Sequence, residues 1–332
     1  MNSQAAFGVE DLTVRIGSAH IVNGVTWSVQ RGQTLGVVGE SGSGKSMTVL
    51  AATGLVPRTT ADIGGHAWLG AAGASGDGGE RTDLLTLTPQ QLGKVLGSRV
   101  GFVFQDPSTS LNPLLTVERQ LTEGLEIHRG LRGAALRRRA VELLELVGIP
   151  DPQRRLRAYP HELSGGMRQR VMIAIALSCD PDVLIADEPT TALDVTVQAQ
   201  ILDEVRGLQE RLGTAVVWIT HDLGVVAGLA DDVVVLFGGQ VVESAPVDDL
   251  FDHQAHPYTR GLMAARPRLG RAGTELVTIP GSPPDPKHLP EGCVFWDRCE
   301  LRADPRCETT RPELLEIGPR RAVRSFCAEE TP

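Results

Sequence analysis

The chain has 332 residues, of which 41% are hydrophobic and 22% charged, so it is long enough for one large domain with an appendage or for two domains. Its net charge of −9 and its pI near 5.4 argue against broad nucleic-acid binding, which needs a basic surface to displace counterions. The first residues lack a secretory signal, and no apolar run reaches the ~18–20 residues that span a bilayer, so we expect a cytoplasmic protein that meets a membrane only through partners.

Apolar, strand-like runs alternate with helix-like stretches over most of the chain. The runs are residues 12–16, 35–38, 100–104, 183–186, 216–219 and 233–237. This alternation predicts an α/β domain with a largely parallel sheet. The glycine-rich residues 70–79 are interpreted as a surface loop within an antiparallel subdomain, and residues 121–176 as mostly helical, with breaks at Pro150, Pro152 and Pro160.

The segment after the second run carries the clearest chemical signal. Gly39-Glu40-Ser41-Gly42-Ser43-Gly44-Lys45-Ser46 fits the G-x-x-x-x-G-K-[ST] pattern of a phosphate-binding loop. In such a loop backbone N–H groups surround phosphate oxygens, Lys45 brings a positive charge to the β- and γ-phosphates, and the Ser46 hydroxyl can ligate Mg²⁺. The alternative is a glycine-rich strand-to-helix turn, but the strand context with both Lys45 and Ser46 favours the phosphate site.

Two further motifs carry polar groups suited to phosphate chemistry. The apolar run 183–186 ends in Asp187, which can hold Mg²⁺ through water, and Glu188, which can polarise an attacking water. The alternative for this pair is a solvated acidic turn. Residues 163–169 put Ser164, Gly165 and Gly166 at an expected helix start, where hydroxyl and N–H groups suit a γ-phosphate. Taken alone, that segment could be an ordinary helix cap.

In this order, the motifs resemble those of ATP-binding-cassette (ABC) ATPases over about residues 8–258. The resemblance implies a P-loop NTPase fold with a RecA-like core, an antiparallel β subdomain and a helical signature subdomain. It implies a Walker A loop at 39–46, a Q-loop at Gln105, a signature at 163–169, Walker B at 183–187, a D-loop at 192–194 and a switch histidine at His221. For nucleotide binding it implies Ile16, Gly39, Glu40, Ser41, Gly42, Ser43, Gly44, Lys45, Ser46, Met47, Gln105, Ser164, Gly165, Gly166, Asp187 and Asp194; for Mg²⁺, Ser46, Gln105 and Asp187; and for catalysis, Glu188, His221 and Gln105. Ile16 stands where the family usually stacks an aromatic residue on adenine, which would leave the base on an aliphatic surface.

Residues 104–113, 159–163, 187–198, 256–259 and 279–299 resemble the dipeptide, oligopeptide and nickel importers, and Thr190-Thr191-Ala192 resembles their D-type ATPase. The resemblance implies ATP hydrolysis that drives uptake of peptides or related small solutes, in a head-to-tail dimer with an F-type ATPase. It also implies two membrane permease subunits, an extracytoplasmic solute-binding protein, no nucleic acid, and a peripheral place at the cytoplasmic face of the membrane. A cassette protein of DNA repair or translation would need a long coiled coil or a second cassette, and a non-catalytic binder should lack Glu188 or His221.

The composition changes after Tyr258, where prolines become frequent and four of the five cysteines follow. We therefore expect an ATPase domain at 6–258 and a C-terminal extension at 259–332. Cys293, Cys299, Cys307 and Cys327 suggest a metal or cluster, because a cytoplasmic protein seldom keeps structural disulfides. The resemblance implies a [4Fe–4S] cluster of structural or regulatory role, whose charge Arg298, Arg302 and Arg306 would offset. The alternatives are four reduced thiols, or Zn²⁺ bound without the C-x₂-C spacing of common zinc ribbons.

Overall fold

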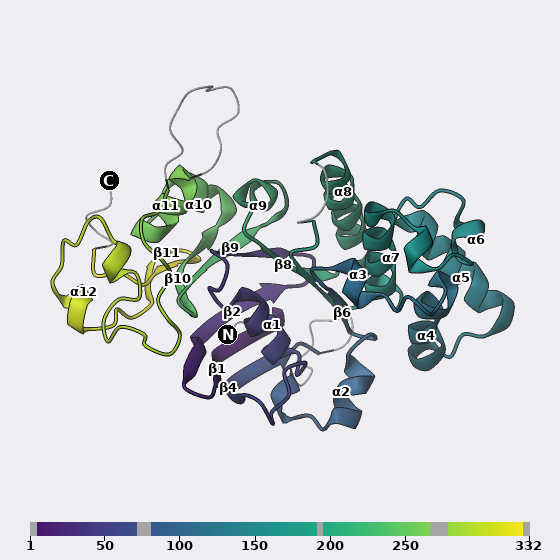
Figure 1. The fold of residues 1–332 in the computed structure, drawn as a ribbon, viewed down its shortest axis with the longest axis horizontal. Helices are drawn as coiled ribbons and strands as arrows, with labels where there is room; N and C mark the ends of the chain where they lie inside the picture. Colours follow the sequence, from purple (N-terminus) through teal and green to yellow (C-terminus); the bar gives the residue numbers. More distant parts are fainter. Residues whose placement is uncertain (1–4, 72–80, 191–194, 266–277, 328–332) are drawn as a thin grey trace. The chain divides into compact units, whose positions relative to one another are not determined.

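The computed structural model describes residues 5–71, 81–190, 195–265 and 278–327, which form two compact units (Figure 1). Unit 1 holds the described parts of Met1–Phe7, Val29–Thr34 and Leu69–Ile219. Unit 2 holds the described parts of Gly8–Ser28, Leu35–Trp68 and Thr220–Pro332. Each unit thus gathers stretches that are far apart in the sequence, and each is described here by itself.

Unit 1 contains a parallel arrangement of β6 (Val100–Val103), β7 (Val183–Asp187) and β8 (Ala215–Thr220), with β7 in the middle. Every residue of β7 and β8 is buried. Strands that are apolar on both faces are typical of a parallel sheet covered on both sides, so the predicted runs at 183–186 and 216–219 are confirmed as central strands.

Helices make up most of the rest of unit 1. The longer ones are α4 (Val117–Arg129), α5 (Gly133–Leu146), α7 (Gly165–Leu177) and α8 (Val195–Leu212). The shorter elements are β5 (Thr82–Asp83), η1 (Leu84–Thr86), α2 (Pro89–Val95), α3 (Pro107–Ser110), α6 (Pro152–Arg155) and η2 (Pro160–Glu162). The predicted helical region is confirmed, and α6 and η2 both begin at prolines that interrupt it, as proline at a first helical position does. Most of the predicted glycine-rich loop, residues 72–80, lies outside the described residues.

Unit 2 contains most of β1 (Ala5–Ile16), β2 (Ala19–Gln30) and β4 (Asp62–Leu69), in the order β2-β1-β4. A two-residue turn at Gly17 and Ser18 joins β1 to β2, which makes them a hairpin and agrees with the expected antiparallel subdomain. Its helices are α1 (Lys45–Ala52), α9 (Leu223–Leu229), α10 (Val247–Asp252), α11 (Pro257–Ala264), η3 (Trp296–Arg298) and α12 (Arg306–Thr309).

A second set of strands in unit 2 joins the C-terminal residues to the strand that precedes the phosphate loop. The order is β11 (Leu315–Gly318), β12 (Arg321–Val323), β10 (Gln240–Pro246), β9 (Asp232–Phe237) and β3 (Thr34–Val38). Only the β3–β9 pairing is parallel. In Figure 1 the yellow strands at the chain's end accordingly lie on the β10 side of this sheet.

Residues 278–327, which we call the C-terminal module, share a hydrophobic core with these strands. Val294 and Phe295 of the module pack in one buried cluster with Phe237, Val242 and Tyr258. The Phe237 and Tyr258 rings lie 4.5 Å apart, and the Phe295 ring meets Phe237 edge-on at 5.3 Å. Buried aromatic pairs of this kind contribute about 0.5–1.5 kcal/mol beyond their area. The module is therefore packed onto β9 and α11 by apolar contacts.

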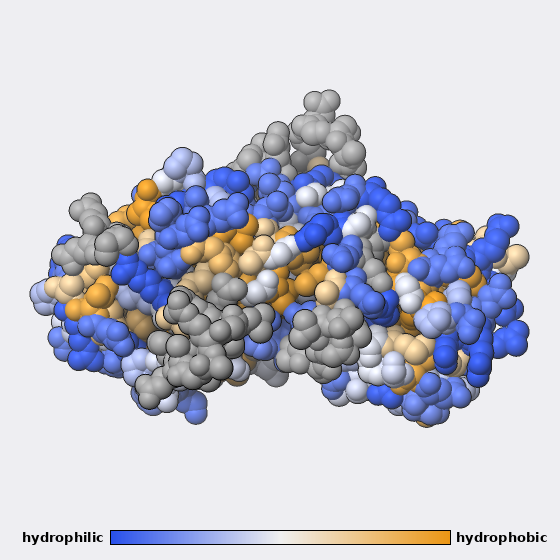
Figure 2. Space-filling view, turned by 90° about the horizontal axis from the view of Figure 1, so that it is seen from above, coloured by the Kyte–Doolittle hydropathy of each residue, from blue (hydrophilic) through white to orange (hydrophobic). Residues whose placement is uncertain are grey.

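Hydrophilic residues cover much of the face shown in Figure 2. Within the described residues, no helix is long and apolar enough to cross a bilayer. The buried apolar side chains of the described parts lie mostly in the strands and helices.

Candidate functional site

The phosphate loop of unit 2 runs from the end of β3 to the start of α1, and its glycines are required by space as well as conformation. A Cβ on Gly39 would lie 2.2 Å from the backbone carbonyl oxygen of Leu236 in β9. Gly44 has a φ of 97°, and a Cβ there would lie 2.9 Å from the carbonyl oxygen of Ile21. The loop backbone is therefore in contact with its neighbours where a side chain would stand, a close approach that only glycine permits.

Lys45 curls back into this loop. Its side chain is only 4% exposed, and its Nζ donates hydrogen bonds to the carbonyl oxygens of Gly39 at 2.8 Å and Glu40 at 2.9 Å. Helix α1 begins at Lys45, and its N-cap residue, Gly44, makes no side-chain cap hydrogen bond. The ammonium group and the positive end of the α1 dipole thus meet at the loop, which is the arrangement that binds phosphate.

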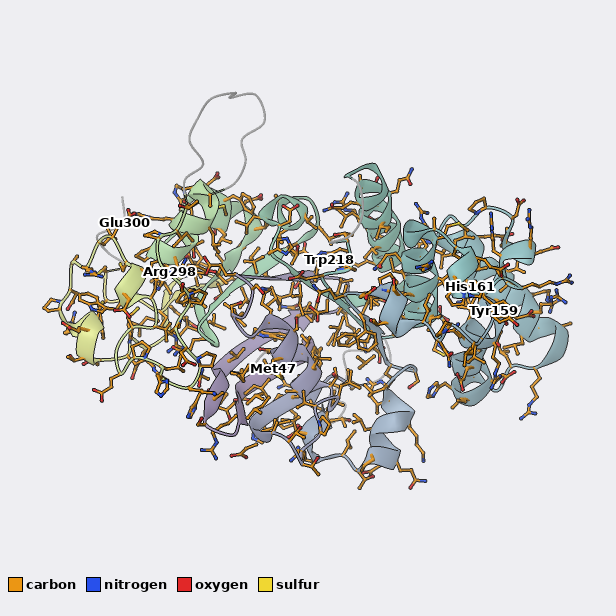
Figure 3. All side chains as sticks on the ribbon, viewed as in Figure 1. Met47, Tyr159, His161, Trp218, Arg298 and Glu300 are labelled. Atoms are coloured by element: carbon orange, nitrogen blue, oxygen red, sulfur yellow. The ribbon has the colours of Figure 1, made fainter. Side chains whose placement is uncertain are left out.

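Ser43 adds an observation that itself fits a phosphate ligand. Its side chain is 3% exposed, and its Oγ is buried without a hydrogen-bond partner among the described residues. Buried polar atoms are normally paired, so an unpaired hydroxyl inside an anion-binding loop is a donor suited to a phosphate oxygen. Ser46 and Met47 follow in the first turn of α1, where Figure 3 labels Met47.

In unit 1 the two residues expected to act on the attacking water lie together. Because β6 and β7 are parallel with Val103 opposite Ala186, Gln105 and Glu188 each lie two residues beyond this pair. The Gln105 Nε2 donates to the Glu188 Oε2 at 3.1 Å. Glu188 has a φ of 45°, a left-handed conformation that costs a non-glycine residue about 1 kcal/mol or more, and its N–H donates to the Ile219 carbonyl at 3.0 Å. The preceding Asp187 ends β7 and is 6% exposed.

The expected signature segment begins α7. Ser164 is the N-cap, its Oγ accepting the Met167 N–H at 3.3 Å, so the predicted helix start is confirmed. Ser164 and Gly165 are exposed, and a Cβ on Gly165 would meet nothing within 4 Å. The hydroxyl serves as a helix cap, and the first turn of α7 is open to a ligand.

Three further residues are expected to contribute to the nucleotide site, namely Ile16, His221 and Asp194. Ile16 ends β1 with 39% of its surface exposed. His221 is exposed in the turn after β8, directly before Asp222, which caps α9. Asp194 and the rest of the expected D-loop lie outside the described residues. The roles assigned to all three remain predictions.

The four C-terminal cysteines line one small cavity together with His256 and Phe295. None of the four forms a disulfide within the described residues, and the Cys293 N–H donates to the Cys307 carbonyl at 2.7 Å. Burial first, and then the neighbouring thiols, raise the pKa of Cys307 to about 12; burial likewise raises the pKa of Cys293. The donor set suits a thiolate-bound group, whose metal ions would lower the pKa values of the coordinating thiols. As they stand, no three His, Cys, Asp or Glu side chains of the described residues are arranged to hold a metal ion.

Sequence reasoning missed the partners of Glu40. Both terminal nitrogens of Arg298 donate to the Glu40 carboxylate, at 2.7 and 3.0 Å, while its expected role of offsetting the charge of a cluster stays a prediction. The Glu40 N–H donates to the Tyr258 hydroxyl oxygen at 2.8 Å. No local signal joins these residues, because Glu40 and Arg298 are 258 positions apart.

Comparison with known proteins covers both parts of the chain. Residues 22–191 match the family model described as ABC transporter, and residues 242–307 match the one described as Oligopeptide/dipeptide transporter, C-terminal region. The chain is 48% identical over 309 residues to the oligopeptide transport ATP-binding protein AppD of Bacillus subtilis, covering 93% of this chain and 91% of that protein. It is 51% identical over 299 residues to the oligopeptide transport ATP-binding protein OppD of Mycobacterium tuberculosis, covering 90% of this chain but 47% of that longer protein.

Solved structures agree with this assignment of the fold. The ATP-binding cassette MJ0796, solved as a dimer bound to ADP and Pi, is 28% identical with a TM-score of 0.62, covering 73% of this chain and 98% of that one. The cbiO1 protein of Clostridium perfringens, part of the ABC transporter complex cbiONQ, is 26% identical with a TM-score of 0.60, covering 75% of this chain and 91% of that one.

Proposed function

The chain belongs to the ABC transporter family, and from that premise we propose that it is the ATP-hydrolysing subunit of an importer for di- and oligopeptides or related small solutes. The observation that carries the proposal is the 48% identity to an oligopeptide transport ATP-binding protein over 93% of the chain, which includes the C-terminal extension. The Gln105–Glu188 hydrogen bond and the phosphate loop around Lys45 support hydrolysis rather than binding alone.

Residues of both units would have distinct roles in ATP binding and hydrolysis. The loop 39–46 would bind the phosphates through its backbone N–H groups and Lys45. Ser46, Asp187 and Gln105 would hold Mg²⁺, which would neutralise phosphate charge. Glu188 accepts a proton from the attacking water, and Gln105 orients the Glu188 carboxylate. His221 senses the γ-phosphate, and Ile16 supports the adenine ring.

We further propose that the chain works as half of a head-to-tail dimer with an F-type ATPase. The sequence has one phosphate loop and one signature, and Ser164 to Gly166 would contact ATP on the partner's loop. The exposed Ser164 and Gly165 support this arrangement, as does the dimeric state of the related MJ0796 cassette. The membrane partners would be two permease subunits served by an extracytoplasmic solute-binding protein, with the chain peripheral at the cytoplasmic face.

The cysteines would hold a [4Fe–4S] cluster of structural or regulatory role, with Zn²⁺ as the alternative. Support comes from the shared cavity of Cys293, Cys299, Cys307 and Cys327. A cluster supplies four bridging sulfides and needs one thiolate per iron, which these residues match in number. Protein purified without oxygen should contain iron and acid-labile sulfide in about equal amounts. Zinc without sulfide would favour the alternative, and neither would leave four reduced thiols.

Reconstitution tests the transport function. The chain, its partner ATPase, the permease subunits and the solute-binding protein are placed in lipid vesicles with ATP, and uptake of labelled di- and oligopeptides is measured. We expect uptake that requires ATP and that Lys45→Ala abolishes, because the loop then lacks its phosphate-binding charge. Hydrolysis without uptake of any peptide would overturn the proposed substrate class.

A further inference from the structure

We propose that Arg298 is a positioning residue for the phosphate loop: it holds and neutralises the Glu40 carboxylate, so that nucleotide affinity depends on the C-terminal module. This inference rests on the proposed function, in which residues 39–46 bind ATP. It adds a residue from the far end of the chain to the support of that loop.

Glu40, the second residue of the loop, is fixed at three points. Its N–H donates to the Tyr258 hydroxyl oxygen at 2.8 Å, and its carbonyl accepts a hydrogen bond from Lys45 Nζ at 2.9 Å. Its carboxylate takes the bidentate pair from Arg298. Two of these three anchors come from residues beyond 257, so the shape of the loop near its start is set by the C-terminal part of unit 2.

Contacts other than the Glu40 ion pair also fix the position of the Arg298 guanidinium. It is 8% exposed, and its Nε donates to the Pro280 carbonyl at 2.7 Å. Its guanidinium carbon lies 5.5 Å from the centre of the Phe237 ring. Figure 3 labels Arg298 in the C-terminal module and Glu300 farther out on it. A guanidinium pre-organised in this way loses little freedom when it binds a carboxylate.

Charge explains why the loop needs this partner. A carboxylate in an anion-binding loop repels the phosphates that the loop must attract, and the side chain of Glu40 is only 25% exposed, so solvent screens it poorly. The paired guanidinium cancels that charge. Without Arg298, the Glu40 carboxylate would be a partly buried negative charge that has lost its bidentate cation.

A simpler interpretation is that the ion pair only fastens the module to the core. The two interpretations differ in the effect of Glu40→Gln. If Arg298 acts by neutralising Glu40, then removing the carboxylate charge should restore the affinity lost with Arg298. If the pair is only a fastener, Glu40→Gln should restore nothing, because a neutral amide leaves the module as loose as before.

The test measures ADP affinity by calorimetry on the full chain for the wild type, Arg298→Ala, Glu40→Gln and the double variant. We expect Arg298→Ala to weaken ADP binding about three- to thirtyfold, the range of substitutions that act through a neighbour. The double variant should regain most of this loss. Arg320→Gln removes a charge from another ion pair of the module, with Asp232, and should leave affinity unchanged.

Arg298→Lys covers the case in which the alanine variant does not fold, because it keeps the charge but cannot form the bidentate pair. We expect it to bind ADP with intermediate affinity, and thermal melting checks that each variant is folded. Wild-type affinity in Arg298→Ala, or a double variant no better than Arg298→Ala, would overturn the inference. Failure of the wild type to bind ADP would overturn the proposed function instead.

Discussion

Gly39→Ala should weaken ATP binding about a hundredfold while leaving the chain folded. The new Cβ would lie 2.2 Å from the Leu236 carbonyl oxygen and 2.8 Å from the Ser43 Oγ, whereas ordinary contacts are 3.4–4 Å. The first obstacle is backbone in β9, which cannot rotate away as a flexible side chain can. The loop must therefore shift by roughly 1 Å, a displacement that costs on the order of a hundredfold at a precisely arranged site.

The matched control is Gly17→Ala in the β1–β2 turn. Gly17 has a φ of 58° and nothing within 4 Å of an added Cβ, so the substitution brings conformational strain of about 1–2 kcal/mol but no collision. Equilibrium binding of ATP and chemical denaturation are measured on both variants. Gly17→Ala should lose stability and keep affinity. Unchanged ATP affinity in Gly39→Ala would refute the close approach of the loop to β9.

Three further outcomes are expected. Glu188→Gln should keep nucleotide binding but lower turnover about 10²–10⁴-fold, because an amide cannot take a proton from water. Phosphate release and nucleotide binding are measured on the same preparation. Wild-type turnover in this variant would exclude Glu188 as the catalytic carboxylate. Ser164→Arg should abolish stimulated hydrolysis in the assembled complex but leave ATP binding to the isolated chain intact, and loss of both would argue against a signature that serves the partner's nucleotide. Burial lowers the pKa of His256 from 6.5 to about 3. Below pH 6.5 the unfolded chain therefore binds a proton at His256 that the folded chain does not bind. The contribution of His256 should lower the free energy of unfolding by about 1.4 kcal/mol per pH unit in that range. His256→Asn keeps a cap acceptor for the Tyr258 N–H and should flatten this slope in denaturation curves between pH 6.5 and 5, whereas equal slopes would show that His256 does not titrate in this way.

The elements that local sequence patterns specify could be predicted from the sequence. The apolar runs predicted the strands β3, β6, β7, β8 and β9, because a strand buried on both faces has few polar positions. The two carboxylates after the run 183–186 indicated Glu188, whereas Gln105 was implied only by the family resemblance; both follow neighbouring parallel strands at one edge of the sheet.

Long-range pairing could not be found in this way. The short strands β11 and β12 join the sheet through β10. They are strands only because they pair with a neighbour, and the sequence does not say which segment that neighbour is. Likewise the place of Arg298 beside Cys299 suggests a role at the cysteines, and nothing in the sequence indicates its ion pair with Glu40. The contacts that decide such cases arise only once distant segments pack together, and no periodicity within either segment carries them.

The rate of ATP hydrolysis with and without partner subunits tests the half-site arrangement most directly. Steady-state phosphate release is measured for the isolated chain, for the chain with its F-type ATPase, and for both with the permease subunits. We expect slow release from the chain alone and a rate that rises as the partners are added, since Lys45 and Ser164 would serve different nucleotides. Full activity of the chain as a monomer would contradict this arrangement.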